Sequence, residues 1–277
     1  YVFHDKGFQK YLRTISYGIM EIRESINKTE FFQLKVPNPS IKEQSQIVSY
    51  LDKKIKQIDQ LVKKIEKTIE LLKEQKISLF NEVVTKGLNA NVEMKNSGVE
   101  WIGEMPSHWK LKKLKYISEI TYGISPNESS YNNIGKGTVL VNGPVEYSIS
   151  DFGYTRSLKW TTEPKKFSKK GSLLFCLRGS TTGRLNISHE DLSIGRGVCS
   201  IQSNEDQNFL IYSMFCIRRW IQGLIQGSTF PSVTKIDVDN YKICSLPTNE
   251  QKQIVKYLDE QKKVIDDSIS KRKKKIK

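Results

Sequence analysis

The chain has 277 residues, enough for about two domains, and its 45 Lys and Arg outweigh its 30 Asp and Glu, for a formal net charge of +15. This positive charge indicates an anionic partner, of which nucleic acid is the commonest. No apolar run approaches the roughly 20 residues of a membrane span, the opening YVFHDKGFQK does not resemble a signal peptide, and the four cysteines form no CxxC pair. We therefore expect free thiols in a reducing cytosol and neither a disulfide framework nor a zinc site.

The first 40 residues contain no complete folding pattern of their own. Residues 18–23 and the strand-like run at 31–37 look like the closing edge of a domain whose body is missing from the sequence. Pro37 and Pro39 end this run, and Ser40 followed by Glu43 is the capping-box pattern of a helix start. Residues 1–40 are therefore interpreted as the C-terminal remnant of a domain, in a fragment or a naturally shortened chain.

Residues 43–85 predict one long helix that packs against another helix. Its apolar positions alternate in steps of four and three, the spacing of a coiled-coil seam. The seam consists of Leu51, Ile55, Ile58, Val62, Ile65, Ile69 and Leu72, and continues, after a break at Lys76, to Leu79 and Val83. A basic last turn and Gly87 predict the helix end. From Leu51 to Thr85 the helix would be about 50 Å long.

This helix start recurs near the end of the chain. EQSQIVSYLD at 43–52 matches EQKQIVKYLD at 250–259, at a constant offset of 207 residues. A repeat this long indicates a duplicated unit of domain plus helix. The second helix keeps Leu258, Ile265 and Ile269 on its seam, and Pro247, Thr248 and Gln251 are expected to cap it. The two helices are predicted to pair antiparallel; the alternative is two unrelated amphipathic surface helices.

Between the two helices the pattern changes to short strands and turns. Trp101 and Trp109 near the start are interpreted as a clasp that opens a new domain, with His108 in a packing or capping role. Apolar runs at 138–141 and 172–177 predict buried strands. Residues 208–225 predict the one clear helix of this domain, whose apolar stripe is core.

Three turns combine glycine with cations or hydroxyls, at 178–184, 194–197 and 227–235. Glycine allows close approach to a sugar-phosphate chain, hydroxyls can bind phosphate oxygens, and arginine can bind a guanine edge. The DNA-binding candidates in these turns are Arg178, Ser180, Thr181, Arg184, Arg196, Thr229 and Lys235, and a further candidate surface contains Tyr147, Arg156 and Lys159. The alternative is ordinary turn chemistry with arginines paired to carboxylates. The basic run at 271–275 likewise fits either a phosphate contact or a solvated helix end.

Catalytic motifs are absent from the sequence. It contains no GxxxxGK[ST], no GxGxxG and no Asn-Pro-Pro-Tyr type tetrad for amino-group methylation. Glu163-Pro164-Lys165 is a poor match to a nuclease carboxylate-lysine pair, and no two histidines lie close in sequence, so no metal site is expected. The chain is therefore interpreted as a binder that gives specificity to enzymes carried by other subunits.

Taken together, these residues resemble the specificity subunits of type I restriction-modification systems. The resemblance rests on SGVEWIGEMPSHW at 97–109, the glycine-containing turns at 179–184, 194–197 and 227–229, and the hinge LPTNEQKQI at 246–254. It implies an α+β fold: a mixed α/β target-recognition domain with short twisted strands, plus two long helices paired as an antiparallel coiled coil. The expected domains are the remnant of a first recognition domain at 1–40, the central helix at 41–88, a second recognition domain at 89–247 and the distal helix at 248–277.

The resemblance also implies a function. Two recognition domains would each read half of a split site in double-stranded DNA, with the helices as a ruler between them. Two modification subunits would dock on the helices and methylate adenine with S-adenosylmethionine, and restriction subunits would add translocation and cleavage driven by ATP with Mg²⁺. The chain itself would bind no cofactor, act in the cytoplasm of a bacterium or archaeon, and restore two half-sites, in a shortened form, by pairing with a second copy of itself. Two other classes remain open: a stand-alone nuclease or methyltransferase, and a coiled-coil adaptor without DNA specificity.

Overall fold

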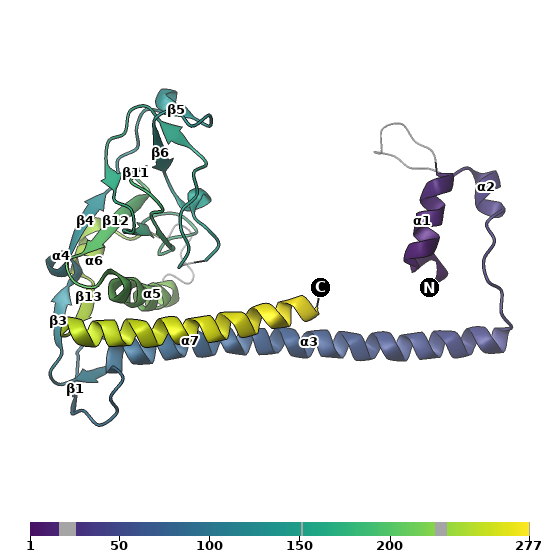
Figure 1. Ribbon diagram of the computed structural model, residues 1–277, viewed down its shortest axis with the longest axis horizontal. Coiled ribbons are helices and arrows are strands. Elements are labelled where there is room, and N and C mark those ends of the chain that lie inside the picture. The colour runs from purple at the N-terminus through teal and green to yellow at the C-terminus, as the bar shows by residue number, and fades with distance from the viewer. Residues whose placement is uncertain (17–25, 151, 225–231, 277) are drawn as a thin grey trace. The chain divides into compact units, whose positions relative to one another are not determined.

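The computed structural model describes residues 1–16, 26–150, 152–224 and 232–276 (Figure 1). The chain divides into two compact units, Tyr1–Lys64 and Ile65–Lys277. The boundary falls inside the long helix α3, Ile41–Lys86, so each unit contains part of that helix.

The first unit is helical. It contains the 3-10 helix η1 (Val2–His4), helix α1 (Lys6–Ile15), helix α2 (Lys28–Phe32) and the beginning of α3. The strand-like interpretation of residues 31–37 is wrong: Asn27 caps α2 by accepting a hydrogen bond from the Thr29 amide, and this favours a helical turn over an extended chain. Residues 18–23 of the predicted domain edge lie outside the described residues.

The ends of α3 follow from local sequence. The Ser40 amide donates to Glu43 Oε2 at 2.9 Å and the Glu43 amide donates to Ser40 Oγ at 3.4 Å, which confirms the capping box. The hydrogen bond from the Ser40 hydroxyl also lowers the pKa of the Glu43 carboxyl. At the other end Gly87 has φ 75° and donates its N–H to the Val83 carbonyl at 3.0 Å, the left-handed cap that the sequence predicts.

In the second unit α3 pairs with the antiparallel helix α7, Thr248–Lys275 (Figure 1). Ile65, Ile69, Leu72 and Leu79 pack with Ile265 and Ile269 in one apolar cluster. Lys76, which interrupts the seam, places its Nζ 2.6 Å from Asp266 Oδ1. The polar break in the α3 stripe is therefore matched by a carboxylate from α7.

The other half of the predicted seam is not buried. Leu51 and Val62 are half-buried, while Ile55 and Ile58 are 43% and 57% exposed. The continuous seam expected from Leu51 onward is therefore corrected to its second half. Helix α7 has 28 residues and α3 has 46, so an antiparallel α7 that begins beside the end of α3 can cover only part of it.

Two sheets form the body of the second unit. The first is antiparallel in the order β10 (Leu185–Ile187), β9 (Leu173–Cys176), β12 (Val198–Ser203) and β4 (Ser118–Tyr122). Strand β9 is buried at all four positions, as the apolar run at 172–177 predicts. The first sheet contributes Leu173, Phe175 and Leu185 to the main core.

The second sheet is mixed. Its order is β5 (Tyr131–Asn132), β7 (Trp160–Thr161), β6 (Thr138–Val141), β11 (Leu192–Ile194) and β8 (Phe167–Ser168), with β6 and β11 parallel. Alternate residues of β9 reach this sheet, because Leu174 and Cys176 pack with Val139, Val141 and Ile194 in a second cluster.

The remaining elements connect these layers. Two further antiparallel pairs are short: the consecutive strands β1 (Met94–Asn96) and β2 (Glu104–Pro106), and the strands β3 (Lys110–Lys113) and β13 (Lys242–Ser245), which are distant in sequence. The helices are α4 (Leu114–Ile117), α5 (Gln207–Leu224) and α6 (Lys235–Asn240), with 3-10 turns η2 (Glu128–Ser130) and η3 (Pro144–Glu146). Helix α5 lies between the strands and the helix pair (Figure 1). The α+β fold class with two long helices is thus confirmed.

Helix α5 joins the two sheets to the helix pair through aromatic packing. Phe80 of α3 lies 5.1 Å from the ring of Tyr212 and 5.7 Å from that of Phe215, both edge to face. Phe152 closes the cluster at 5.8 Å from Phe80. The Tyr212 hydroxyl donates to Asp259 of α7 at 2.6 Å. Helix α5 therefore packs against α3 and forms a hydrogen bond with α7.

The predicted tryptophan clasp centres on Trp109, which is fully buried. Its Nε1 donates to Glu250 Oε1 at 3.0 Å, and His108 Nε2 lies 3.1 Å from the other oxygen of the same carboxylate. A Cβ on Gly87 would lie 3.1 Å from the Trp109 ring. One indole thus contacts the last cap of α3 and the first turn of α7.

The predicted capping at the start of α7 is wrong. Pro247 occupies the cap position. Among the described residues, no side chain forms a cap hydrogen bond there. Gln251 is buried instead, where its Nε2 donates to the Leu246 carbonyl at 2.9 Å and to Glu205 Oε2 at 2.6 Å. Its side-chain amide forms hydrogen bonds with neighbouring polar groups that would otherwise be buried without a partner, because the helix start packs against the strands.

Alanine at Gly87 tests the clasp. Gly98 also has positive φ but open space around it, so Gly98→Ala should cost only the left-handed strain of about 1 kcal/mol. Gly87→Ala should cost roughly 1 kcal/mol more, because its Cβ meets a buried ring that cannot move freely. Urea unfolding of both variants measures the difference, and equal losses would show that Trp109 is not held against the cap.

Candidate nucleic-acid interface

A cavity of about 590 Å³ lies where the turn after β9 meets the turns before β12 and α6. Its lining consists of Tyr122, Gly123, Leu177, Arg178, Gly179, Arg196 and residues 232–235. Three of the predicted DNA-binding side chains, Arg178, Arg196 and Lys235, thus come together from three separate turns.

Backbone contacts fix these turns against one another. Arg178 forms an isolated β-bridge with Ser232, and the Val233 amide donates to the Leu177 carbonyl at 2.9 Å. A Cβ on Gly123 would lie 2.2 Å from the Gly195 carbonyl oxygen, a distance that no side chain tolerates. Glycine is therefore required where the turn carrying Arg196 crosses the end of β4.

Lys235 is held by the aromatic residue at the end of β4. Its Nζ lies 5.0 Å from the centre of the Tyr122 ring, a cation–π distance. The Tyr122 hydroxyl lies 2.6 Å from Asp239 Oδ1 and 3.0 Å from the Lys235 carbonyl oxygen. Burial, together with the bond to Asp239, raises the pKa of Tyr122, so the phenol stays neutral and remains a donor.

The cavity is strongly positive. Within the part of the chain that the structure describes, none of Arg178, Arg196 and Lys235 makes an ion pair. Arg178 is exposed and follows Leu177, which is buried, so its backbone is anchored while its guanidinium remains available. Fixed backbones with available cations are suited to binding phosphate oxygens or base edges.

The other residues of the 178–184 turn differ in their surroundings. Ser180 is exposed, whereas Thr181 Oγ1 lies 3.7 Å from Cys176 Sγ. Arg184 donates to the Ser148 carbonyl at 2.8 Å and to the Pro144 carbonyl at 3.5 Å. Its guanidinium therefore stabilises the loop around η3 and is not directed at the cavity. Thr229 lies outside the described residues.

The second predicted surface is only partly exposed. Tyr147 is 1% exposed and packs in the core with Val139 and Val141, so the prediction that it contacts DNA is wrong. Arg156 is exposed, but its Nη2 donates to the Val145 carbonyl at 2.9 Å. Lys159 is half-buried with its Nζ 5.6 Å from the centre of the Tyr131 ring.

Tyr122 is the one described lining side chain of this cavity with a functional contact that was not among the predicted residues. Tyr122 stands at a strand end just before Gly123, the same arrangement that marked the predicted turns, and this signal could have found it. Residues 232–234 belong to the predicted turn at 227–235, but their place beside Arg178 depends on pairing between distant segments.

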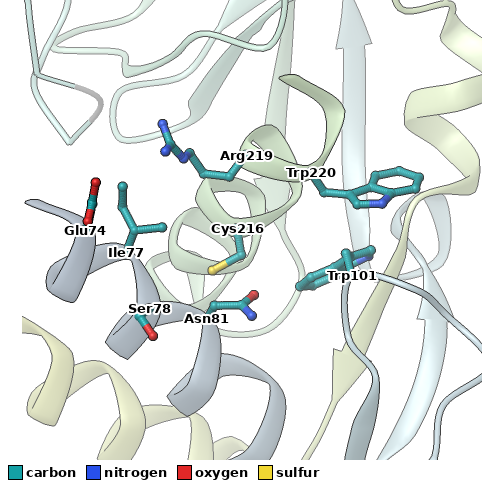
Figure 2. Close-up of a pocket in the computed structure, with 8 residues that line it drawn as sticks. All are labelled: Glu74, Ile77, Ser78, Asn81, Trp101, Cys216, Arg219 and Trp220. Atoms are coloured by element: carbon teal, nitrogen blue, oxygen red, sulfur yellow. The ribbon is translucent and has the colours of Figure 1, made fainter. Parts of the chain in front are cut away.

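A second cavity of about 420 Å³ lies between α3, α5 and Trp101 (Figure 2). Cys216 faces it, and burial raises the pKa of this thiol, so it stays protonated and a poor nucleophile. Among the described residues there is no group of three or more His, Cys, Asp or Glu side chains that could hold a metal. A search of the helices in the described ranges finds none long and apolar enough to cross a membrane.

The family model of the type I restriction modification DNA specificity domain matches residues 106–277, more than half of the chain. The chain belongs to this family. The matched region contains all three cations of the cavity and the whole of α7.

Curated relatives from Methanocaldococcus jannaschii agree with this assignment. A candidate type I restriction enzyme MjaX specificity subunit is 35% identical over 260 residues, covering 91% of this chain and 57% of the relative. The type I restriction enzyme MjaVIII specificity subunit is 34% identical over 98 residues, covering 35% of this chain and 21% of that protein. The chain thus spans a little over half the length of the longer match.

Solved structures support the fold. A chain from a study of complex assembly and conformational transition of the type I R-M system has a TM-score of 0.76 at 20% identity, covering 96% of this chain and 63% of that one. The HsdS subunit from Thermoanaerobacter tengcongensis has a TM-score of 0.62 at 20% identity, with coverage of 97% and 62%.

Two arginines of one turn should behave differently on substitution. Arg184→Ala removes a charged donor from two carbonyls and should lower the free energy of unfolding by about 2 kcal/mol. Arg178→Ala, at an exposed side chain, should change it by less than about 0.5 kcal/mol. Urea unfolding of both variants checks this, and a large loss for Arg178→Ala would mean that the cavity cations are structural.

Proposed function

We propose that this chain is a DNA-recognition part of a type I restriction-modification specificity subunit, and that it reads one half-site through the cavity of Arg178, Arg196 and Lys235. The observation that supports this most directly is the convergence of three cations, without ion pairs in the described chain, from three separate turns. Cations on turns with a fixed backbone can bind the phosphates of a duplex and, from the same place, the edge of a base.

The chain would not itself catalyse a reaction. Modification subunits, two in a full assembly, would dock on the α3–α7 pair and methylate adenine with S-adenosylmethionine. Restriction subunits would contribute ATP-driven translocation and Mg²⁺-dependent cleavage. The names of the curated relatives, which are specificity subunits, favour this role over that of a stand-alone nuclease, methyltransferase or coiled-coil adaptor.

A bipartite target needs a second recognition domain. It would come either from a longer form of the chain or from a second copy, and the two cases predict different targets. Two different domains read an asymmetric site, whereas two copies of this domain read a palindromic one. The complex would act in the cytoplasm, where the DNA of a bacterium or archaeon lies.

The double variant Arg178→Ala with Arg196→Ala tests the proposal. Combined with the cognate modification subunits, the unchanged chain should direct methylation to a defined site, which sequencing of methylated DNA identifies. Loss of a base contact should relax one position of that site by about 1–3 kcal/mol, and loss of a phosphate contact should weaken methylation at all sequences alike. Lys165→Ala with Lys169→Ala, which removes the same charge from exposed positions near β8, is the matched control.

Three results would contradict the proposal. Methylation or cleavage by the purified chain alone would identify an enzyme. Equal methylation patterns with and without the chain would identify an adaptor. An unchanged pattern in the double variant, at unchanged affinity, would mean that the target is read elsewhere.

A further inference from the structure

A third cavity, of about 390 Å³, lies where α3, α5 and α7 meet the loop before Phe152. It is positive, like the cavity of Arg178, Arg196 and Lys235. Among the lining residues that the structure describes, five are cations and one is an anion: Lys73, Lys76, Arg218, Arg219, Lys273 and Asp266. The cations come from three helices that are distant in sequence, so the fold, and no single basic run, produces this concentration of charge.

The single anion is already neutralised. Asp266 lies 2.6 Å from Lys76 Nζ and 3.9 Å from Lys262 Nζ. Lys73, Arg219 and Lys273 are exposed and make no ion pair within the described ranges. Glu74 lines the neighbouring cavity with Arg219, but no ion pair joins these two side chains (Figure 2). Cations held close together repel one another, so an anion bound among them is stabilised.

One lining residue of this cavity, Arg218, lies near the turn at 178–184. Gly183 has φ 83°, and a Cβ there would lie 3.4 Å from Arg218 Cγ. The turn that begins with Arg178, in the cavity described above, therefore ends next to Arg218 of α5, which lines the 390 Å³ cavity.

We propose that Lys73, Arg219 and Lys273 bind the sugar-phosphate backbone of the DNA next to the half-site, as a contact that does not depend on sequence. The proposal rests on the proposed function, in which a duplex lies on the recognition cavity. A phosphate backbone presents a negative charge about every 3.4 Å along each strand, which suits several cations at the rim of one cavity. From the strand body α3 and α7 continue side by side (Figure 1), and DNA between two half-sites needs contacts that ignore its bases.

An acidic protein surface is the other anionic partner that this cavity could receive. DNA is favoured because exposed cations from three helices line the cavity without ion pairs in the described ranges, an arrangement that suits successive phosphates of one strand. The exposed lining side chains are also mainly charged, with Ile149 as the exposed apolar exception. An obligate protein interface would be expected to be more apolar at its centre.

The test uses the full chain, a random-sequence DNA duplex and a range of salt concentrations, with binding followed by fluorescence anisotropy. Lys73→Gln with Lys273→Gln should weaken binding at low salt and reduce the slope of log K against log salt by about 1.8, or about 0.9 for each phosphate contact. Lys67→Gln with Lys271→Gln is the matched control: the same two helices lose the same charge at exposed positions that do not line the cavity. Its slope should stay close to that of the unchanged chain.

The outcomes separate this proposal from the proposed function. A cavity variant with the slope of the control overturns the phosphate contact. An unchanged slope with weakened binding of the modification subunits identifies a protein-docking surface and also overturns it. A reduced slope supports the contact, whether or not site-directed methylation is found. If methylation shows no defined site while the slope still falls in the cavity variant, the proposed function fails and the phosphate contact stands.

Discussion

The structure of the second unit depends on the carboxylate of Glu250. It accepts the buried indole N–H of Trp109 on one oxygen and lies 3.1 Å from His108 on the other. A buried indole without an acceptor would cost several kcal/mol, so this bond fixes the first turn of α7 against the strand body. The same indole contacts the Gly87 cap of α3. Trp109 therefore links the last turn of α3 and the first turn of α7 at one point.

A single apolar core extends from this point. It includes Phe80 and Val84 of α3, Met214 and Ile217 of α5, and Leu258 of α7, together with residues of the first sheet. The helices are thus not a separate rod attached by a linker, because their side chains and those of the strand body exclude water together. This continuity matters for function, since a helix pair can set the position of a reading surface only if the two move as one body.

The internal repeat shows how strongly burial depends on context. In the second copy Gln251, Ile254 and Leu258 are almost completely buried against the strand body. In the first copy the matching Ile47 is 49% exposed, and Val48, the match of Val255, is 43% exposed. The two motifs have nearly the same side chains and both are helical. Helix formation is decided locally, by the spacing of apolar residues and, in α3 alone of the two, by the capping box of Ser40 and Glu43, whereas burial needs a packing partner.

Local sequence patterns were enough to predict several elements, and composition alone gives the net charge of +15. The capping box at Ser40, the glycine cap at Gly87, the seam period and the apolar runs at β6 and β9 are local patterns, and each acts through the backbone within a few residues. Tertiary structure alone decided which polar residues remain available. Arg178 and Arg184 belong to one turn and have the same chemistry, yet Arg184 donates to carbonyls near η3 while Arg178 lines a cavity to which residues 122–123, Arg196 and residues 232–235 also contribute. For the same reason Tyr147 is buried in the core, whereas Tyr122 lines the cavity of Arg178, Arg196 and Lys235. The neighbours of each side chain depend on strand pairing between distant segments, which no local pattern encodes.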